Sequence, residues 1–250
     1  MGATANPGAA HHGKYQTVVV PAATLPNEVI GKMADLYLSN FDGSSVAIFR
    51  EDLAEKDEVL LVYQEDELVG FTTLKILQFR HAGNQARAVY SGDTIVAPQH
   101  WGQQVLAFAW IAHVGEIKRQ APHLPLFWFL LVKGHRTFRY LSVFSKSFFP
   151  HWAEDRADLK ILADHLAAAK FGSHYDPVSG LVRFPESRGH LRREIAEPSA
   201  EEREKPATRF FLEKNPGYRL GHELVCICEL ETFNMKPLTA RIFSKAAKER

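Results

Sequence analysis

Residues 86–106 read ARAVYSGDTIVAPQHWGQQVL, and this stretch decides how the chain folds. Its first half is rich in β-branched and apolar side chains, which indicates a strand over 86–97. Pro98 ends that strand, because proline cannot donate to a β-ladder. Apolar residues at helical spacing then predict a helix from about residue 99 to 119. A strand, a short loop with one glycine and a helix therefore follow one another directly.

Further strands lie on both sides of this stretch. Residues 58–65 and 68–79 have the pattern of strands, and tight turns join them to 86–97 as an antiparallel meander. Residues 124–132, LPLFWFLLV, are a continuous apolar run, typical of a strand buried on both faces. A right-handed crossover places this strand parallel to 86–97. The predicted fold class is therefore α/β with a mixed central sheet.

We expect one domain between two tails. Residues 1–14 contain no patterned apolar segment and predict a disordered tail, and residues 236–250 predict a second tail. Residues 15–235 form the domain, and residues 153–215 are an elaboration within it. Half of the residues in segment 186–207 are charged, which favours a solvated loop or a mobile lid.

Composition excludes several classes of function. The 250 residues are 46% hydrophobic and 24% charged, as in ordinary soluble proteins. Lys and Arg number 30 against 29 Asp and Glu, a net charge of +1, which argues against a nucleic-acid partner. Cys226 and Cys228 are too few for a disulfide framework, and His222 beside them does not complete a zinc site. Without a signal peptide or a membrane-length apolar run, we expect a cytoplasmic protein with no membrane partner and no metal.

The junction between the strand and the following helix is suited to an anion, because amides at a helix N-terminus are unpaired. This junction and the order of elements resemble the GCN5-related N-acetyltransferase superfamily. Val96, Pro98, Gln99 and Gly102 match its coenzyme A motif, whereas Gln104 stands where a second small residue is usual.

The resemblance covers residues 15–150 and the final strand, and it implies an acyl-CoA N-acyltransferase fold. In such folds strands 86–97 and 124–132 splay apart, and an acyl-pantetheine arm lies between them. The co-substrate would be acetyl-CoA or another acyl-CoA. Gly92 is consistent with a bulge that opens the sheet or with a packing accommodation. The expected donor-binding residues are Ile95, Val96, Gln99, His100, Trp101, Gly102, Gln103 and Gln104.

Acyl transfer to an amine needs a base and a proton donor. Asp93 lies in an unusually polar part of its strand and is the candidate base, with a structural acid or an anchor for the amine as alternatives. The superfamily often uses a tyrosine where this chain has Phe144. Tyr140, one turn earlier, is therefore the candidate proton donor, with Ser145 as an alternative donor and a packing role as the other interpretation of Tyr140.

Two groups of residues have two interpretations each. The basic group Lys133, His135, Arg136 and Arg139 either meets phosphates or an acidic carrier, or is a solvated helix start. The aromatic residues between 127 and 152 either form core or line a tunnel for a long acyl chain.

The predicted function is transfer of an acetyl or longer acyl group from acyl-CoA to a small-molecule amine acceptor. One alternative is an N-acyl synthase whose donor is an acyl carrier protein. Another is a non-catalytic member of the fold that binds a ligand or a partner. A homodimer stays open, since the final strand of this fold often pairs between subunits.

Overall fold

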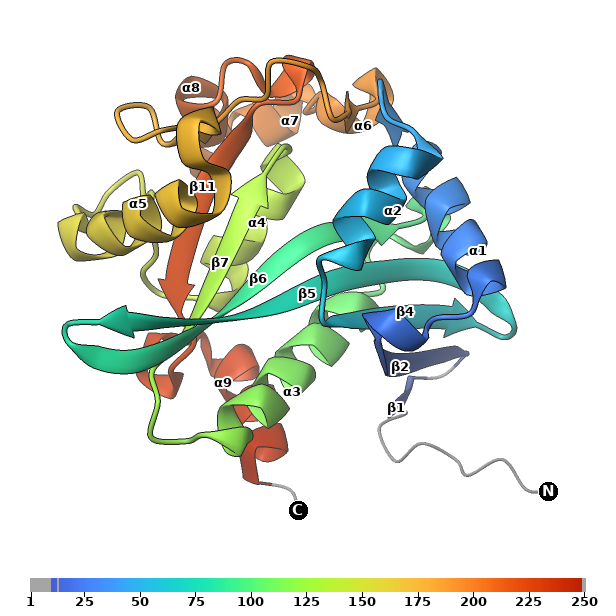
Figure 1. The fold of residues 1–250 in the computed structure, drawn as a ribbon, viewed down its shortest axis with the longest axis horizontal. Coiled ribbons are helices and arrows are strands. Elements are labelled where there is room, and N and C mark those ends of the chain that lie inside the picture. Colours follow the sequence, from blue (N-terminus) through green and yellow to red (C-terminus); the bar gives the residue numbers. More distant parts are fainter. Residues whose placement is uncertain (1–9, 13, 249–250) are drawn as a thin grey trace.

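The computed structural model describes residues 10–12 and 14–248. Over these residues the chain forms one nine-stranded mixed sheet with helices on both faces (Figure 1). In spatial order the strands are β1 (Ala10–His12), β2 (Tyr15–Pro21), β4 (Glu58–Gln64), β5 (Glu67–His81), β6 (Asn84–Val96), β7 (Leu126–Val132), β11 (Glu223–Glu229), β9 (Leu181–Val182) and β8 (Tyr175–Asp176). A separate ribbon pairs β3 (Phe41–Asp42) with β10 (His190–Leu191).

The centre of the sheet is the predicted meander followed by the predicted parallel strand. β4, β5 and β6 pair antiparallel in chain order. β7 lies parallel to β6, in register from Arg87 opposite Leu126 to Ser91 opposite Leu130. These pairings confirm the α/β class with a mixed central sheet.

Two sets of helices cover the two faces of the sheet. One face carries α1 (Asn27–Leu38), α2 (Val46–Ala54) and α5 (Ala157–Phe171). The other carries α3 (Val105–Gln120), α4 (His135–Phe144), α8 (Pro206–Lys214) and α9 (Pro237–Lys248). Alternate residues of a strand point to opposite faces. Leu126, Trp128 and Leu130 of β7 accordingly join the α3–α4 core, whereas Phe127 and Phe129 join the α5 core, so β7 is buried on both faces.

The predicted C-terminal tail over 236–250 is wrong for residues 237–248. These residues form α9, which packs along α3 (Figure 1). Gly115 of α3 permits this close approach, since a Cβ there would lie 2.6 Å from the Phe243 carbonyl oxygen. Phe243 itself is 2% exposed, so α9 completes the core on the α3 face.

The predicted N-terminal tail over 1–14 is also wrong in part. Residues Ala10–His12 form β1, which pairs antiparallel with β2 at the edge of the sheet. The rest of that prediction, for residues 1–9 and 13, lies outside the described residues.

The elaboration at 153–215 extends the sheet and then crosses the molecule. α5 covers β11, and the short strands β8 and β9 continue the sheet beyond it. The chain next forms β10 and two short helices, α6 (Arg193–Ala196) and α7 (Ala200–Arg203). Ala196 is 2% exposed, and β10 pairs with β3 next to α1. The solvated loop predicted for 186–207 is therefore wrong, because this segment packs against the body of the protein.

Candidate functional site

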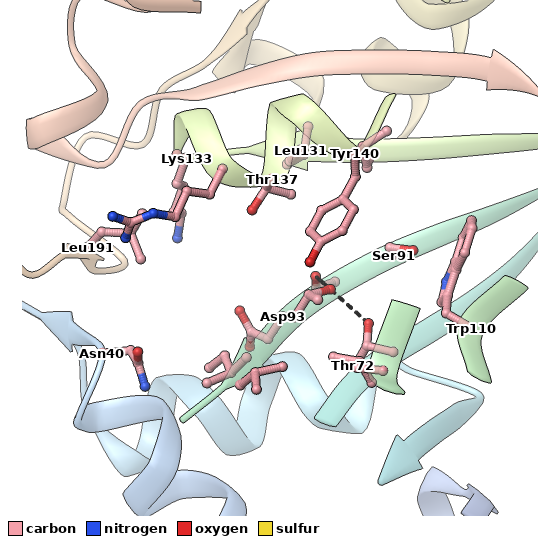
Figure 2. A pocket seen from close by; sticks show the side chains of 18 of the residues that line it. Asn40, Thr72, Ser91, Asp93, Trp110, Leu131, Lys133, Thr137, Tyr140 and Leu191 are labelled. Carbon is pink, nitrogen blue, oxygen red and sulfur yellow. Dashed lines mark hydrogen bonds between the residues drawn. The ribbon is translucent and has the colours of Figure 1, made fainter. Parts of the chain in front are cut away.

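The parallel strands β6 and β7 separate at their carboxyl ends. Their pairing stops at Ser91 and Leu130, whereas β6 continues to Val96 and β7 to Val132. A cavity of about 820 Å³ occupies this gap and is lined by residues of α1, α2, α3, α4 and segment 183–204 as well (Figure 2). The splay that the resemblance implied is thus present.

A β-bulge at Gly92 shapes the wall of the cavity. Thr72 of β5 lies opposite Thr94, but Leu74 lies opposite Ser91, so two residues of β6 face Thr73 alone. A Cβ on Gly92 would clash with the Thr73 hydroxyl and lie 2.6 Å from Cε of Lys56. The shift in register confirms the predicted bulge, and a side chain at Gly92 would require Thr73 and Lys56 to move. The bulge re-aims the next residue, Asp93, which lines the cavity.

Asp93 is a partly buried carboxylate without a direct partner. Burial first, and the Asp52 carboxylate second, raise the pKa of Asp93 to about 7, although Lys133 and Lys56 oppose the shift. Asp52 pairs with Lys56 at 2.5 Å, and Glu223 pairs with Lys133 at 3.0 Å. Among the described residues, Asp93 is the one cavity carboxylate that has neither an ion pair nor a hydrogen bond. It is thus poised to exchange a proton near neutral pH.

Tyr140 approaches from the opposite wall. Figure 2 shows its ring extending from α4 across the cavity towards the part of β6 that carries Asp93. Its hydroxyl makes no hydrogen bond within the part of the chain that the structure describes. Burial raises the pKa of Tyr140 and Arg139 opposes this, so the hydroxyl stays protonated at neutral pH.

The position that the superfamily often fills with tyrosine has a different role here. Phe144 is 6% exposed and packs on Trp110 and Trp128, with ring centroids 6.0 and 5.9 Å away. The neighbouring Ser145 donates to Sγ of Cys228 in the core. Tyr140 is therefore the phenol that α4 directs into the cavity, and Thr137 of the same helix also lines it.

The loop before α3 ends in an open helix N-terminus. Gln104 precedes α3 with a left-handed φ of 60° and provides no side-chain cap. The first-turn amides of α3 therefore have no acceptor within the helix. This geometry also explains why a small residue suits the position of Gln104, since φ > 0 favours glycine. The lining includes every predicted loop residue from His100 to Gln104, but Gln99 is exposed and lies outside it.

Of the two predicted backbone positions, Ile95 and Val96, only Val96 faces the open edge of β6. The Ala97 amide donates to Val69 of β5, so the backbone groups of Ile95, two residues earlier, face β5 as well. Val96 faces the open edge, and its carbonyl accepts a hydrogen bond of 2.7 Å from the Trp101 indole. A ligand that pairs with the Val96 carbonyl therefore either displaces Trp101 or shares this oxygen with it.

The cavity also contains residues that the sequence did not assign to a site. Tyr37 and Asn40 enter from α1 and its end, and Arg188, Leu191 and Glu202 enter from the elaboration. A local signal existed for Glu202, because Ser199-x-x-Glu202 is the pattern of a helix capping box. The structure contains that capping box at the start of α7.

The aromatic residues between 127 and 152 mostly form core. Phe127, Phe129, Phe138 and Phe148 are at most 4% exposed and lie outside the cavity lining. Phe144 and Trp128 do line it. The cavity is therefore apolar where Trp128 and Phe144 meet Trp110 of α3, without the long aromatic tunnel that one interpretation required.

Other parts of the chain carry no comparable arrangement. Cys226 and Cys228 are fully buried, and burial raises the pKa of both thiols. No group of three or more metal-ligating side chains was found among residues 10–12 and 14–248. Nor does any helix in that part of the chain have the length and apolar character needed to cross a membrane.

No family model and no curated protein matches this chain, but solved structures do. A probable N-acyltransferase from Enterococcus faecalis V583 aligns over 54% of this chain and 33% of its own, with 14% identity and a TM-score of 0.40. A GCN5-related N-acetyltransferase from Kribbella flavida aligns over 53% and 33%, with 16% identity and a TM-score of 0.39. A GNAT family N-acetyltransferase from Escherichia coli, in complex with CoA, aligns over 54% and 72%, with 14% identity and a TM-score of 0.37. This chain spans about a third of the first two proteins, and the likeness concerns the fold alone.

Proposed function

We propose that this protein is an acyltransferase that moves an acyl group from a pantetheine thioester such as acetyl-CoA to an amine. The observation that carries the proposal is the unpaired Asp93 carboxylate in a cavity between two splayed parallel strands. The open N-terminus of α3 lies on the same cavity and suits the phosphates of such a donor.

Each reaction step then has a residue within the cavity. Asp93 takes a proton from the acceptor ammonium, which frees the nitrogen lone pair to attack the thioester carbonyl. The new C–N bond forms, the C–S bond breaks, and the leaving thiolate takes a proton from Tyr140. The second proton of the attacking nitrogen then passes to the Tyr140 phenolate and restores its hydroxyl, and Asp93 releases its proton to solvent. A carboxyl pKa of about 7 suits the first step, because the group is then partly ionised and still basic at neutral pH.

A second candidate is a ligand-binding protein without catalysis. It is favoured by the hydrogen bond between Trp101 and the Val96 carbonyl, which occupies the edge that a pantetheine arm would use. The two candidates differ in turnover and not in binding. Their test must therefore measure both.

The experiment combines calorimetry with an assay for released thiol. Acetyl-CoA, a medium-chain acyl-CoA and free CoA are titrated into the protein, and each thioester is then incubated with a panel of small amines. We expect one thioester to bind and to release thiol only with an amine present. The kcat/KM should rise as the pH passes through about 7, since Asp93 must lose its proton.

Matched variants separate the roles. Asp93→Asn should lose turnover and keep donor binding, whereas Gly102→Glu should lose donor binding. Gly83→Glu is the control for the latter, because Gly83 has a similar φ of 82°, is equally free of neighbours and lies in the β5–β6 turn. Binding without turnover would favour the ligand-binding candidate. Full turnover in Asp93→Asn would overturn the proposed role of Asp93.

A further inference from the structure

The start of α4 carries an arrangement of charge that a helix normally avoids. His135, Arg136 and Arg139 lie within its first turns and all line the cavity. The N-terminus of a helix carries partial positive charge, so cations there are unfavourable unless an anion faces them. Gly134 at the N-cap has no side chain to supply one. We name these three residues the basic cluster.

The group that faces the basic cluster is Glu202 of α7. Its Oε1 lies 3.6 Å from Nε2 of His135, 3.7 Å from Nε of Arg136 and 4.0 Å from Nη1 of Arg139. These distances exceed those of hydrogen bonds. Its Oε2 accepts from the Ser199 amide at 2.9 Å in the capping box. One carboxylate that is already engaged thus faces two guanidinium groups and an imidazole.

The basic cluster consequently has unused capacity for an anion. His135 is 1% exposed, and its Nε2 has no hydrogen-bond partner in the part of the chain that the structure describes. The Arg136 guanidinium donates to the Ile195 carbonyl at 3.1 Å and lies 4.5 Å from the Trp101 ring. Two permanent positive charges meet a single negative one, so the cluster keeps an excess of positive charge inside the cavity.

We propose that the basic cluster binds a phosphate group of the acyl donor and that Glu202 is an internal competitor for this position. The proposal rests on the proposed function. A tetrahedral phosphate offers several oxygens to donors that converge from different directions, and arginine binds phosphate in bidentate fashion. The Glu202 carboxylate offers only one oxygen to these donors, because its other oxygen accepts from the Ser199 amide in the capping box.

The same site also reaches the edge of β6. Trp101 lies against Arg136 and donates to the Val96 carbonyl. A phosphate that attracts Arg136 away from the indole weakens the contact that holds Trp101 on this edge. Donor binding would thereby expose the Val96 carbonyl, which is the group expected to pair with the pantetheine arm.

The test measures binding of 4′-phosphopantetheine and of pantetheine, which differ only in the phosphate. Glu202→Gln keeps the capping pattern but removes the competing charge, so it should bind 4′-phosphopantetheine roughly tenfold more tightly and pantetheine unchanged. Arg139→Gln should weaken 4′-phosphopantetheine roughly tenfold. Arg209→Gln is the control, because Arg209 is exposed on α8 and pairs with Glu204 outside the cavity.

Coenzyme A identifies the source of the phosphate. If Arg139→Gln weakens CoA and 4′-phosphopantetheine alike, the cluster holds the phosphate that a carrier-bound donor also has. If it weakens CoA alone, the cluster holds a phosphate of the nucleotide. If it weakens neither, or if Glu202→Gln changes pantetheine as much as 4′-phosphopantetheine, the proposal is wrong.

The thiol-release assay keeps this proposal apart from the proposed function. Phosphate-dependent binding without turnover of any thioester would leave the site in place and refute the acyltransferase. If the protein turns over a thioester and Arg139→Gln leaves the KM for that donor unchanged, the acyltransferase is supported and the phosphate site is refuted. Thermal unfolding of each variant shows that it is folded before either measurement.

Discussion

Replacing Asp93 with asparagine should stabilise the protein above neutral pH and leave its stability unchanged in acid. Burial first, and then Asp52, raise the pKa of Asp93 from 3.8 to about 7 in the folded chain. Such a group binds its proton more tightly when folded. Its stabilising contribution is therefore complete below about pH 4 and is lost as the pH rises through about 7.

The size of the effect follows from this pKa difference. About three pH units at 1.36 kcal/mol each give up to about 4 kcal/mol of unfolding free energy, lost once Asp93 is ionised. Asparagine has nearly the same shape without the charge, so Asp93→Asn should recover most of that amount. For a chain of this length, the melting temperature at alkaline pH should rise by on the order of 10 °C.

The assay is urea unfolding followed by tryptophan fluorescence, at intervals from about pH 4.5 to 8.5. Asp66→Asn is the control, because Asp66 lies exposed in the turn between β4 and β5. We expect the stability difference between Asp93→Asn and the unaltered protein to grow from about pH 4.5 to about pH 7 and to level off above it. If the free energy of unfolding varied with pH in the same way for both proteins, the reasoning would be refuted. It would mean that ionisation of Asp93 does not destabilise the folded state.

Three further substitutions test other parts of the structure. Gly92→Ala should lower the free energy of unfolding by about 1–3 kcal/mol, because the new methyl group clashes with Thr73. Gly31→Ala in α1 should raise it by about 0.5–1 kcal/mol, because a methyl group there meets nothing within 4 Å. Thermal melts of the two variants test both. Gln104→Gly should raise the melting temperature by about 2 °C because it relieves a left-handed φ of 60°, and a fall would show that the glutamine side chain is needed. Burial lowers the pKa of His113, but hydrogen bonds to two glutamates outweigh it and raise the pKa to about 9. His113→Gln should therefore cost stability below about pH 6.5 and progressively less up to about pH 9, and a loss that does not vary with pH in urea unfolding would contradict this.

The sequence predicts those features that depend on local pattern. The meander and the buried strand β7 follow from apolar periodicity and turn residues, and the structure confirms both. The bulge follows from Gly92 within a strand. Once the strand, the loop and the helix are placed, Asp93 and the loop from His100 to Gln104 lie on one cavity as a consequence of chain order. Tyr140 reaches it because α4 begins directly after β7.

The sequence does not reveal contacts between distant segments. The charged segment 186–207 looks solvated because half its residues are ionised, but its charges meet partners far away in the chain. Arg188 pairs with Glu51, and Glu202 faces the start of α4. Likewise α9 becomes a core helix only because Gly115 leaves room for it on α3. The packing of segment 186–207 and of α9 thus depends on residues that lie far away in the sequence, which a local sequence pattern does not reveal.

A single extra residue in β6 determines which side chains reach the site. Ala88 and Tyr90 pack on the same sheet face as Ile95, although residues an odd number apart point to opposite faces of a regular strand. The bulge at Gly92 and Asp93 reverses the alternation between them. Deleting Gly92 would restore a regular ladder and turn Ile95 out of the core beneath α1 and α2. We therefore expect the deletion to abolish cooperative thermal unfolding where Gly92→Ala only lowers its midpoint, and an equally mild effect of both would show that the reversal is not needed for this core.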